Sequence, residues 1–569
     1  MKKLLLLSAV IAFIGCSQTQ PSEMKPTSAL DFTSGIDSTY LFKHLSVIAH
    51  DSLEGRDTGS KGQEKAANYI IEHYKRLGVK GGMGDGSYLQ PLELNTSKLN
   101  SVSFTISVTD RSEKKGADGK IMINEEVYEM ESVLTSESAS DIIQIYGGEV
   151  SFSADVIFAG VGITDETHGV KPFEGVDVKD KWVLVFMDIP SVVDGDTVLS
   201  PGFNNSSRYR EIIMGLGAKG LLMIPETEAR FMRNAENAKS SIGKTSGLRL
   251  AYLDEEKEGL TFSYCLINPK SAAKLLSLAD TTALKDKYTE ISKGLKEFKA
   301  TPLSATIEIK TDSKPEVVVS NNIVAVIEGS DPVLKNEYVV VSAHYDHVGV
   351  GSPDKNGDTI YNGADDDGSG TVGILAVAEA LSKAKNAGVG PKRSVIILHV
   401  TGEEKGLLGS RFYSDHPTVP VENIIANINV DMIGRIDDDY VKKGEKNYVY
   451  VIGGSIISSA MDSLLTVANT KSTKMNLDMK YNDLNDRNQF YRRSDHWNFG
   501  RLGIPFSFFF NGTHPDYHRP GDDISKIVFD EYARRAQLVY AYTIEVANMN
   551  KRPVVDNQEF INKTKANPR

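Results

Sequence analysis

The chain has 569 residues, of which 40% are hydrophobic and 25% charged, and its formal net charge is −12 at pH 7. One hydrophobic core stops growing at about 250–300 residues, so a chain of this length is expected to form two or more domains. The excess of acidic residues favours solubility and argues against a nucleic-acid partner, which would select a basic surface.

The first residues have the pattern of an export signal. Two lysines precede an apolar stretch, residues 4–15, which is too short to cross a bilayer but suits a signal peptide. Cys16 and the polar residues after it resemble a bacterial lipoprotein signal, although Phe13 stands where leucine is usual. We therefore expect a signal peptide over residues 1–16, a lipid on Cys16, and a location in the cell envelope facing the periplasm or the exterior. Ordinary secretion is the alternative, and the lipid would be the only membrane attachment.

Helices are predicted for residues 36–78, where apolar residues recur at helical spacing and Gly78 provides a stop. A glycine-rich loop at 53–62 interrupts them. Between about 100 and 300 the pattern changes to short β-like runs separated by turns, which indicates a separate α+β module. No residues in this region have the spacing of metal ligands. Its expected strands are 102–108, 156–159, 182–187 and 220–224, and its expected helices are 207–217 and 269–299.

From residue 303 onward strands and helices alternate, which is the α/β pattern. Runs rich in β-branched residues, such as 338–343, are typical of strands that are buried on both faces. The polar residues 551–569 predict a frayed tail. The expected strands are 323–327, 338–343, 394–400, 424–433 and 504–510, and the expected helices are 371–385, 407–413 and 531–549.

Residues that commonly bind metals follow three of these strands. His344 and Asp346 come after one strand, Glu403 and Glu404 after the next, and Asp431 lies near the end of a third. In α/β sheets ligands bind at the carboxyl ends of the strands, so these side chains are expected to meet at one edge. Imidazoles and carboxylates without a thiolate suit zinc or a similar divalent ion in an open, catalytic site.

The run 363–370, Gly-Ala-Asp-Asp-Asp-Gly-Ser-Gly, has two interpretations. An aspartate such as Asp366 or Asp367 caps the helix that follows, since aspartate is common at N-caps. Alternatively the run binds a cation, which would offset the repulsion between three consecutive carboxylates. With His344 upstream, we favour the metal site.

The other candidates also have structural alternatives. Glu403 and Glu404 are either two carboxylates favoured by a helix dipole, or one binds metal while the other faces a water molecule. Asp431 is flanked by apolar residues, and a buried carboxylate is costly unless it is paired or coordinating, so we favour a ligand role. Each histidine has a neighbouring rival: His347 for His344, and His514 for His518.

Residues 303–550 resemble the co-catalytic di-zinc aminopeptidase family, whose relatives include secreted bacterial leucyl aminopeptidases, glutamate carboxypeptidase and the transferrin receptor. The motif segments match in order and spacing, and 493–505 matches the segment before the last ligand. The loop 55–60 resembles the family's amino-terminal segment, and residues 130–300, with 173–185, are similar to its protease-associated domain. The resemblance implies an α/β fold, a mixed central β-sheet flanked by helices, with that α+β domain inserted. The expected divisions are 1–16 signal peptide, 17–32 linker, 33–110 amino-terminal part of the peptidase domain, 111–300 insert, 301–550 catalytic domain and 551–569 tail.

Carried over position by position, the resemblance implies a site for two metal ions. Asp366 would bridge them, and the Asp366–Asp367 peptide would be cis. The other roles implied are His344 and Asp431 on one metal, Glu404 and His518 on the other, Glu403 as general base, and Asp346 as the carboxylate that orients His344.

The resemblance implies a metal-dependent exopeptidase, and among these an aminopeptidase that hydrolyses the amino-terminal bond of peptide substrates. Two zinc ions (Zn2+) per chain are expected, with Mn2+ or Co2+ as alternatives. A carboxypeptidase, a dipeptidase or a one-zinc glutaminyl cyclase of the same fold is the first alternative. A non-catalytic, receptor-like relative is the second. The sequence does not indicate which substrate side chain the site prefers, or the oligomeric state.

Overall fold

A computed structural model describes residues 26–115, 121–138, 140–147, 150–243, 247–254 and 262–566. The expected signal peptide and Cys16 lie outside these residues. In the described part of the chain, no helix is both long and apolar enough to span a membrane. The chain forms two compact units: unit 1 contains Met1–Leu92 and Ser320–Arg569, and unit 2 contains Glu93–Val319.

Unit 1 is built on a mixed β-sheet with the strand order β17-β16-β18-β15-β13-β14-β12. Its central strands β14, β13, β15 and β18 are parallel, while β12 and β16 pair antiparallel with their neighbours. The mixed sheet flanked by helices is the predicted architecture. The strands are β12 (Thr301–Ile327), β13 (Tyr338–His344), β14 (Ser394–Val400), β15 (Ile424–Val430), β16 (Tyr448–Gly453), β17 (Asn476–Asp478) and β18 (Phe506–Phe510).

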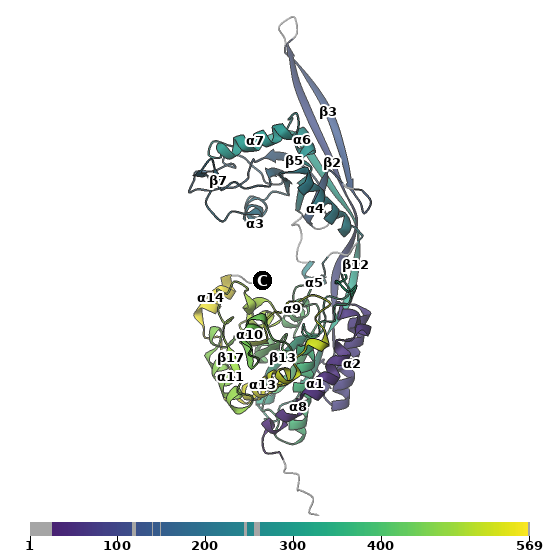
Figure 1. The fold of residues 1–569 in the computed structure, drawn as a ribbon, viewed down its shortest axis with the longest axis vertical. Helices are drawn as coiled ribbons and strands as arrows, with labels where there is room; N and C mark the ends of the chain where they lie inside the picture. Colours follow the sequence, from purple (N-terminus) through teal and green to yellow (C-terminus); the bar gives the residue numbers. More distant parts are fainter. Residues whose placement is uncertain are drawn as a thin grey trace, which may run out of the picture. The chain divides into compact units, whose positions relative to one another are not determined.

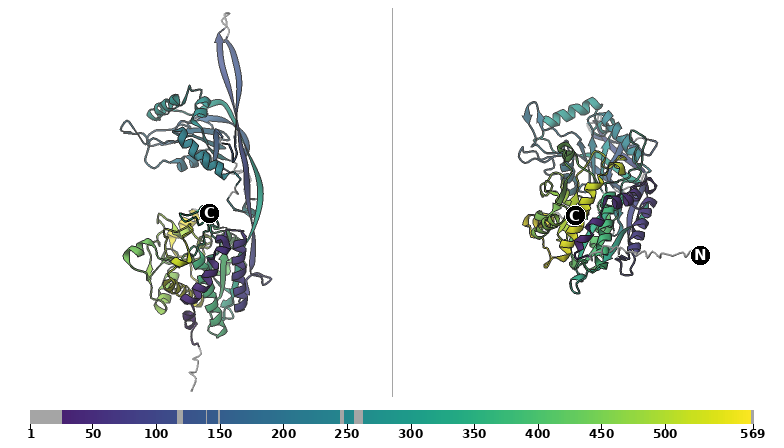
Figure 2. Two further views of the ribbon diagram at one scale, coloured as in Figure 1. Left: turned by 45° about the vertical axis from the view of Figure 1, so that its right-hand side comes forward. Right: turned by 60° about the horizontal axis from the view of Figure 1, so that its bottom comes forward.

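Hydrophobic cores cover both faces of this sheet. Val339 and Val341 of β13 belong to one core and Val340 to another, as expected where successive side chains point to opposite faces. The first core includes residues of five long helices, and the amino-terminal α1 contacts the carboxy-terminal α13 (Figures 1 and 2). These helices are α1 (Ser38–Ile48), α2 (Lys61–Leu77), α8 (Gly368–Asn386), α11 (Ser459–Lys471) and α13 (Phe529–Asn548).

Several boundaries in unit 1 matter for the site. Helix α2 ends at Gly78, which has the predicted role and a φ of 68°. Helix α9 (Leu408–Asp415) begins after Glu403 and Glu404, so these residues lie in the loop before the helix. The expectation that 551–569 is a frayed tail is wrong for α14 (Gln558–Ala566), because Phe560 is buried in a core.

Unit 2 contains the parallel strands β5, β6, β9 and β11, with β4 antiparallel to β11, and a long hairpin of β2 and β3. Helices lie between β6 and β9 and between β9 and β11, whereas none lies between β5 and β6, so only part of the unit departs from the predicted α+β arrangement toward α/β. Its strands are β2 (Leu89–Lys115), β3 (Ile121–Leu134), β4 (Ile142–Gly147), β5 (Ser151–Phe158), β6 (Trp182–Phe186), β9 (Gly220–Ile224) and β11 (Ser263–Ile267), and its helices include α3 (Asn205–Tyr209), α4 (Glu228–Ser241), α6 (Pro269–Leu275) and α7 (Thr281–Lys293).

Two expectations for unit 2 differ from the structure. The single helix expected at 269–299 is two, because Ser277 has a left-handed φ of 54° and Asp280 caps a new helix. The units divide at residues 92 and 320, inside the 27-residue strands β2 and β12, rather than at 110 and 301. A boundary within a continuous strand carries no turn signal, so the sequence did not reveal it.

Candidate metal centre

The five predicted metal ligands converge at the carboxyl edge of the parallel strands in unit 1. His344 is the last residue of β13, Glu404 follows β14, and Asp431 follows β15 directly. Asp366 lies in the loop that leads into α8, and His518 lies between β18 and α13. Three strands and two loops therefore supply one cluster, as the positions of these residues after the strands predict.

Asp366 is the centre of this cluster because its two carboxylate oxygens have different partners. Oδ1 lies 3.2 Å from Nε2 of His344, and the same nitrogen is 3.7 Å from Oδ1 of Asp431. Oδ2 lies 3.1 Å from Nε2 of His518, which is 3.0 Å from Oε2 of Glu404. Two groups of ligands thus share one carboxylate.

His347 belongs to the second group, although the sequence offered it as the rival of His344. Its Nδ1 lies 2.7 Å from Oε1 of Glu404 and 3.8 Å from Oδ2 of Asp366. His347, Asp366 and Glu404 place their ligand atoms within 4.8 Å of one another, as do His344, Asp366 and Asp431. The sequence signal for His347 was its place three residues after His344.

His514, the rival of His518, points to other carboxylates. Its Nε2 lies 3.3 Å from Oδ2 of Asp365 and 3.8 Å from Oδ1 of Asp522. The backbone amides of Asp365 and Asp366 donate to the Asp522 carboxylate. This second set of polar groups therefore supports the loop that carries Asp366.

The residues present fit a pair of divalent cations. Nε2 of His344, Oδ2 of Asp366 and Nε2 of His518 are buried and lack a hydrogen-bond partner, a costly state that coordination would relieve. Although burial alone would raise it, the imidazoles of His347 and His344 hold the pKa of Asp366 well below its usual range. The carboxylate is thereby kept ionised. Nitrogen and oxygen donors without sulfur suit zinc, manganese or cobalt.

Asp367 performs the capping function that the sequence offered as the alternative for this run. Its carboxylate accepts hydrogen bonds from the backbone amides of Gly370 (2.8 Å), Met432 (3.0 Å) and His344 (3.1 Å). The Asp366–Asp367 peptide is cis, as expected. The capping interpretation of the aspartate run therefore applies to Asp367, and metal binding by Asp366 stays a prediction.

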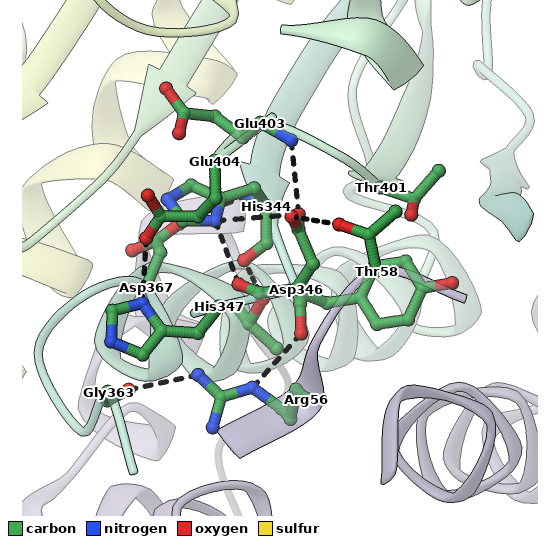
Figure 3. A network of polar contacts seen from close by, with 12 residues as sticks. Arg56, Thr58, His344, Asp346, His347, Gly363, Asp367, Thr401, Glu403 and Glu404 are labelled. Atoms are coloured by element: carbon green, nitrogen blue, oxygen red, sulfur yellow. Dashed lines mark hydrogen bonds and ion pairs between the residues drawn. The ribbon is translucent and has the colours of Figure 1, made fainter. Parts of the chain in front are cut away.

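The contacts of Asp346 differ from the expected one. Nδ1 of His344 lies 3.0 Å from the backbone carbonyl oxygen of Asp346 and 3.8 Å from its carboxylate. That carboxylate accepts hydrogen bonds from the hydroxyl of Thr58 (2.9 Å) and the backbone amide of Glu403 (3.2 Å), as Figure 3 shows. The backbone of Asp346 thus orients His344, and its side chain fixes the start of the Glu403 loop.

Arg56 is a supporting residue that sequence reasoning missed. It is buried, and its guanidinium donates to the carbonyl oxygens of Tyr345 (3.0 Å), Asn362 (2.7 Å) and Ile48 (2.7 Å). It also donates to the carbonyl oxygen of Gly363 (3.0 Å), as Figure 3 shows. The carbonyls of Tyr345, Asn362 and Gly363 flank the segments that carry His344 and Asp366, and that of Ile48 lies at the end of α1. An arginine in the glycine-rich loop 53–62 was the only sequence signal for this role.

Glu403 lines a small pocket beside the cluster together with Asp366 and Asp431. Burial raises the pKa of Glu403 well above its usual value, and the neighbouring carboxylate of Asp495 adds to this effect against the opposing influence of His344. A carboxylate with a raised pKa is a better proton acceptor near neutral pH. Its position and pKa suit a general base.

Comparisons with known proteins agree with this geometry. Residues 322–543 match the family model of Peptidase family M28. A probable leucine aminopeptidase of Arthroderma benhamiae (strain ATCC MYA-4681 / CBS 112371) is 30% identical over 225 residues, which cover 38% of this chain and 56% of that protein. The probable leucine aminopeptidase of Arthroderma otae (strain ATCC MYA-4605 / CBS 113480) is 31% identical over 228 residues, covering 38% of this chain and 57% of the relative. The chain thus spans a little over half the length of these curated relatives.

A solved structure shares the fold over most of the chain. The aminopeptidase from Aneurinibacillus sp. strain AM-1 superposes with a TM-score of 0.50 at 16% identity, covering 93% of this chain and 98% of that one. At this identity the likeness concerns the fold alone.

Proposed function

We propose that the protein is a metal-dependent exopeptidase, specifically an aminopeptidase that hydrolyses the amino-terminal bond of peptides. The observation that carries the proposal is the division of the Asp366 carboxylate between two ligand groups, with Glu403 lining the adjoining pocket. The match of residues 322–543 to a peptidase family and the names of the curated relatives support it.

Two zinc ions are the proposed cofactors, with Mn2+ or Co2+ as alternatives. His344, Asp366 and Asp431 would hold one ion, and Asp366, Glu404 and His518, assisted by His347, the other. When bound, such ions supply Lewis-acid chemistry that polarises the substrate carbonyl and activates water. Glu403 would accept the proton of the attacking water and return it to the departing amine. A free α-amine would bind beside the carboxylates.

Two of the alternatives, the glutaminyl cyclase and the non-catalytic relative, are less well supported by the site. A one-zinc glutaminyl cyclase does not require two ligand groups around a shared Asp366. A non-catalytic relative does not require Glu403 at its place in the pocket. A carboxypeptidase or a dipeptidase of the same fold is compatible with the cluster and is separated from the proposal by the substrates it cleaves.

Hydrolysis of short peptides with free or acetylated amino termini tests the proposal. The zinc-loaded chain should cleave free peptides only, chelation should abolish cleavage, and Glu403→Gln should lower kcat by about 10²–10⁴. Cleavage of acetylated peptides would instead indicate a carboxypeptidase or an endopeptidase. Absence of turnover with two ions bound would refute the peptidase assignment.

We also propose that Cys16 is lipidated and anchors the protein to the bacterial envelope, and that unit 2 is a protease-associated-like insert. The first proposal rests on the sequence of residues 1–16, and the second rests on the resemblance of residues 173–185 to a protease-associated domain.

Membrane fractionation of the chain and of Cys16→Ala tests the anchor. The variant should leave the membrane fraction, and its retention there would contradict lipid anchoring.

A further inference from the structure

The pocket beside the metal centre offers a place for the first side chain of a substrate. Its walls are Met432, Phe490, Phe508, Phe510 and Tyr517, and its border includes the predicted ligands Asp366 and Asp431 and the predicted base Glu403. If the α-amine and the scissile bond lie at the cluster, as the proposed function requires, this adjoining pocket receives the side chain of the amino-terminal residue.

Arg493 is the one basic residue among the side chains that line this pocket. It is exposed, its guanidinium carbon lies 5.1 Å from the centre of the Phe490 ring, and no carboxylate of the described residues forms an ion pair with it. Other arginines nearby have polar partners: Arg435 pairs with Asp516 at 2.9 Å, and Arg492 contacts Gln489. Arg493 is therefore available to a ligand.

The backbone next to Arg493 is held close to the metal centre. The hydroxyl of Ser494 donates a hydrogen bond of 2.7 Å to Oδ2 of Asp431, and the hydroxyl itself accepts one of 2.9 Å from the side chain of Asn429. The position of Arg493 along the pocket is thus coupled to a predicted metal ligand. Its side chain packs on an aromatic ring, which limits its freedom.

The pocket is small, with a volume of about 30 Å³. A space of this size holds roughly one or two water molecules. An acidic side chain that enters from the open side could place its carboxylate at the rim, near Arg493. A guanidinium presents several N–H donors in a geometry that matches a carboxylate, and it repels a basic side chain.

We propose that Arg493 is a specificity-determining residue that selects peptides whose amino-terminal residue is acidic, aspartate or glutamate. This inference rests on the proposed aminopeptidase function and names its substrate class. The competing explanation is that Arg493 only offsets the negative charge of the ligand cluster. In that case its removal would weaken metal binding and slow all substrates equally.

The test compares kcat/KM for Glu-Ala-Ala, Gln-Ala-Ala and Lys-Ala-Ala, each amidated at its carboxy terminus so that the side chain carries the only substrate carboxylate. With the zinc-loaded full chain, we expect the Glu peptide to exceed the Gln peptide about tenfold, as for a charged hydrogen bond at a partly exposed site. Arg493→Gln should bring this ratio to about 1 while the Gln peptide and the zinc content change little. Arg487→Gln removes the same charge from the same loop, outside the pocket lining, and should keep the ratio.

The other outcomes would overturn the inference. A Glu/Gln ratio near 1 in the unaltered protein would exclude charge selection. An equal loss for all three peptides in Arg493→Gln, together with lost zinc, would assign Arg493 to support of the metal centre. Cleavage of none of the peptides, nor of any other free peptide, with zinc bound would refute the proposed function and this inference with it.

Discussion

Nε2 of His518 lies 3.1 Å from Oδ2 of Asp366, whereas the other oxygen of that carboxylate lies 3.2 Å from His344. One side chain thus joins two sets of ligands whose residues interleave along the sequence of unit 1. The metal stoichiometry and the activity should therefore both depend on Asp366 more than on any ligand that contacts a single group.

Replacement of the shared carboxylate should remove both metals. In Asp366→Asn we expect less than one zinc per chain after dialysis, because both groups lose a charged ligand, whereas Glu404→Gln should keep the ion of the His344 group. Metal analysis of the dialysed proteins measures this, with the exposed Asp358→Asn as control. Two zinc ions retained by Asp366→Asn would contradict the shared role.

Replacement of the predicted base should affect the chemical step alone. Glu403→Gln preserves the shape of the side chain but cannot accept a proton, so kcat should fall by about 10²–10⁴. Zinc content and unfolding should stay the same, as checked by metal analysis and urea titration. Activity within threefold of the unaltered protein would rule out Glu403 as the base.

Removal of the buried guanidinium should weaken the whole centre. Arg56→Met leaves four backbone carbonyls without their donor, which should cost about 3 kcal/mol or more in the free energy of unfolding. Zinc affinity should fall as well, because Tyr345 and Gly363 flank the ligand segments. Urea unfolding with and without zinc measures both effects. Arg56→Lys keeps the charge but not the planar set of N–H donors, so it should restore only part of the lost stability and zinc affinity. A change below about 1 kcal/mol would show that the carbonyls find other donors.

A buried histidine away from the metal centre predicts a loss of stability in acid. The hydroxyl of Tyr74 lies 2.6 Å from Nε2 of His399, and burial lowers the pKa of His399 to about 3 from its ordinary 6.5. Between these values the unfolded chain binds a proton that the folded chain does not, so stability falls as the pH falls through this window. At pH 5 the loss from this group is about 2 kcal/mol.

His399→Gln removes that titration while keeping a polar partner for Tyr74. The decrease in the free energy of unfolding between pH 7 and pH 5, measured in urea, should be smaller in the variant by about 2 kcal/mol. Equal decreases in the two proteins would mean that His399 is protonated as readily in the folded state as in the unfolded one.

The sequence predicted most of the strands of unit 1 and the edge at which the candidate ligands meet, because buried parallel strands and the residues after them have a recognisable pattern. The residue pattern alone did not separate the roles of Asp366 and Asp367, which depend on the direction of each side chain from adjacent backbone positions; only the family resemblance assigned the bridging role to Asp366. The contact between His347 and Glu404 depends on loop conformation in the same way. Arg56 is linked to the site through distant carbonyls, which leave no pattern in the sequence. The catalytic roles of these residues stay predictions.

The most direct test of the proposed two-metal centre is anomalous diffraction from crystals of the zinc-loaded protein, recorded on both sides of the zinc absorption edge. A centre for two metal ions around Asp366 should give two zinc peaks per chain, one among Oδ1 of Asp366, His344 and Asp431, and one among Oδ2 of Asp366, Glu404 and His518. A single peak, or two peaks that do not share Asp366, would contradict it.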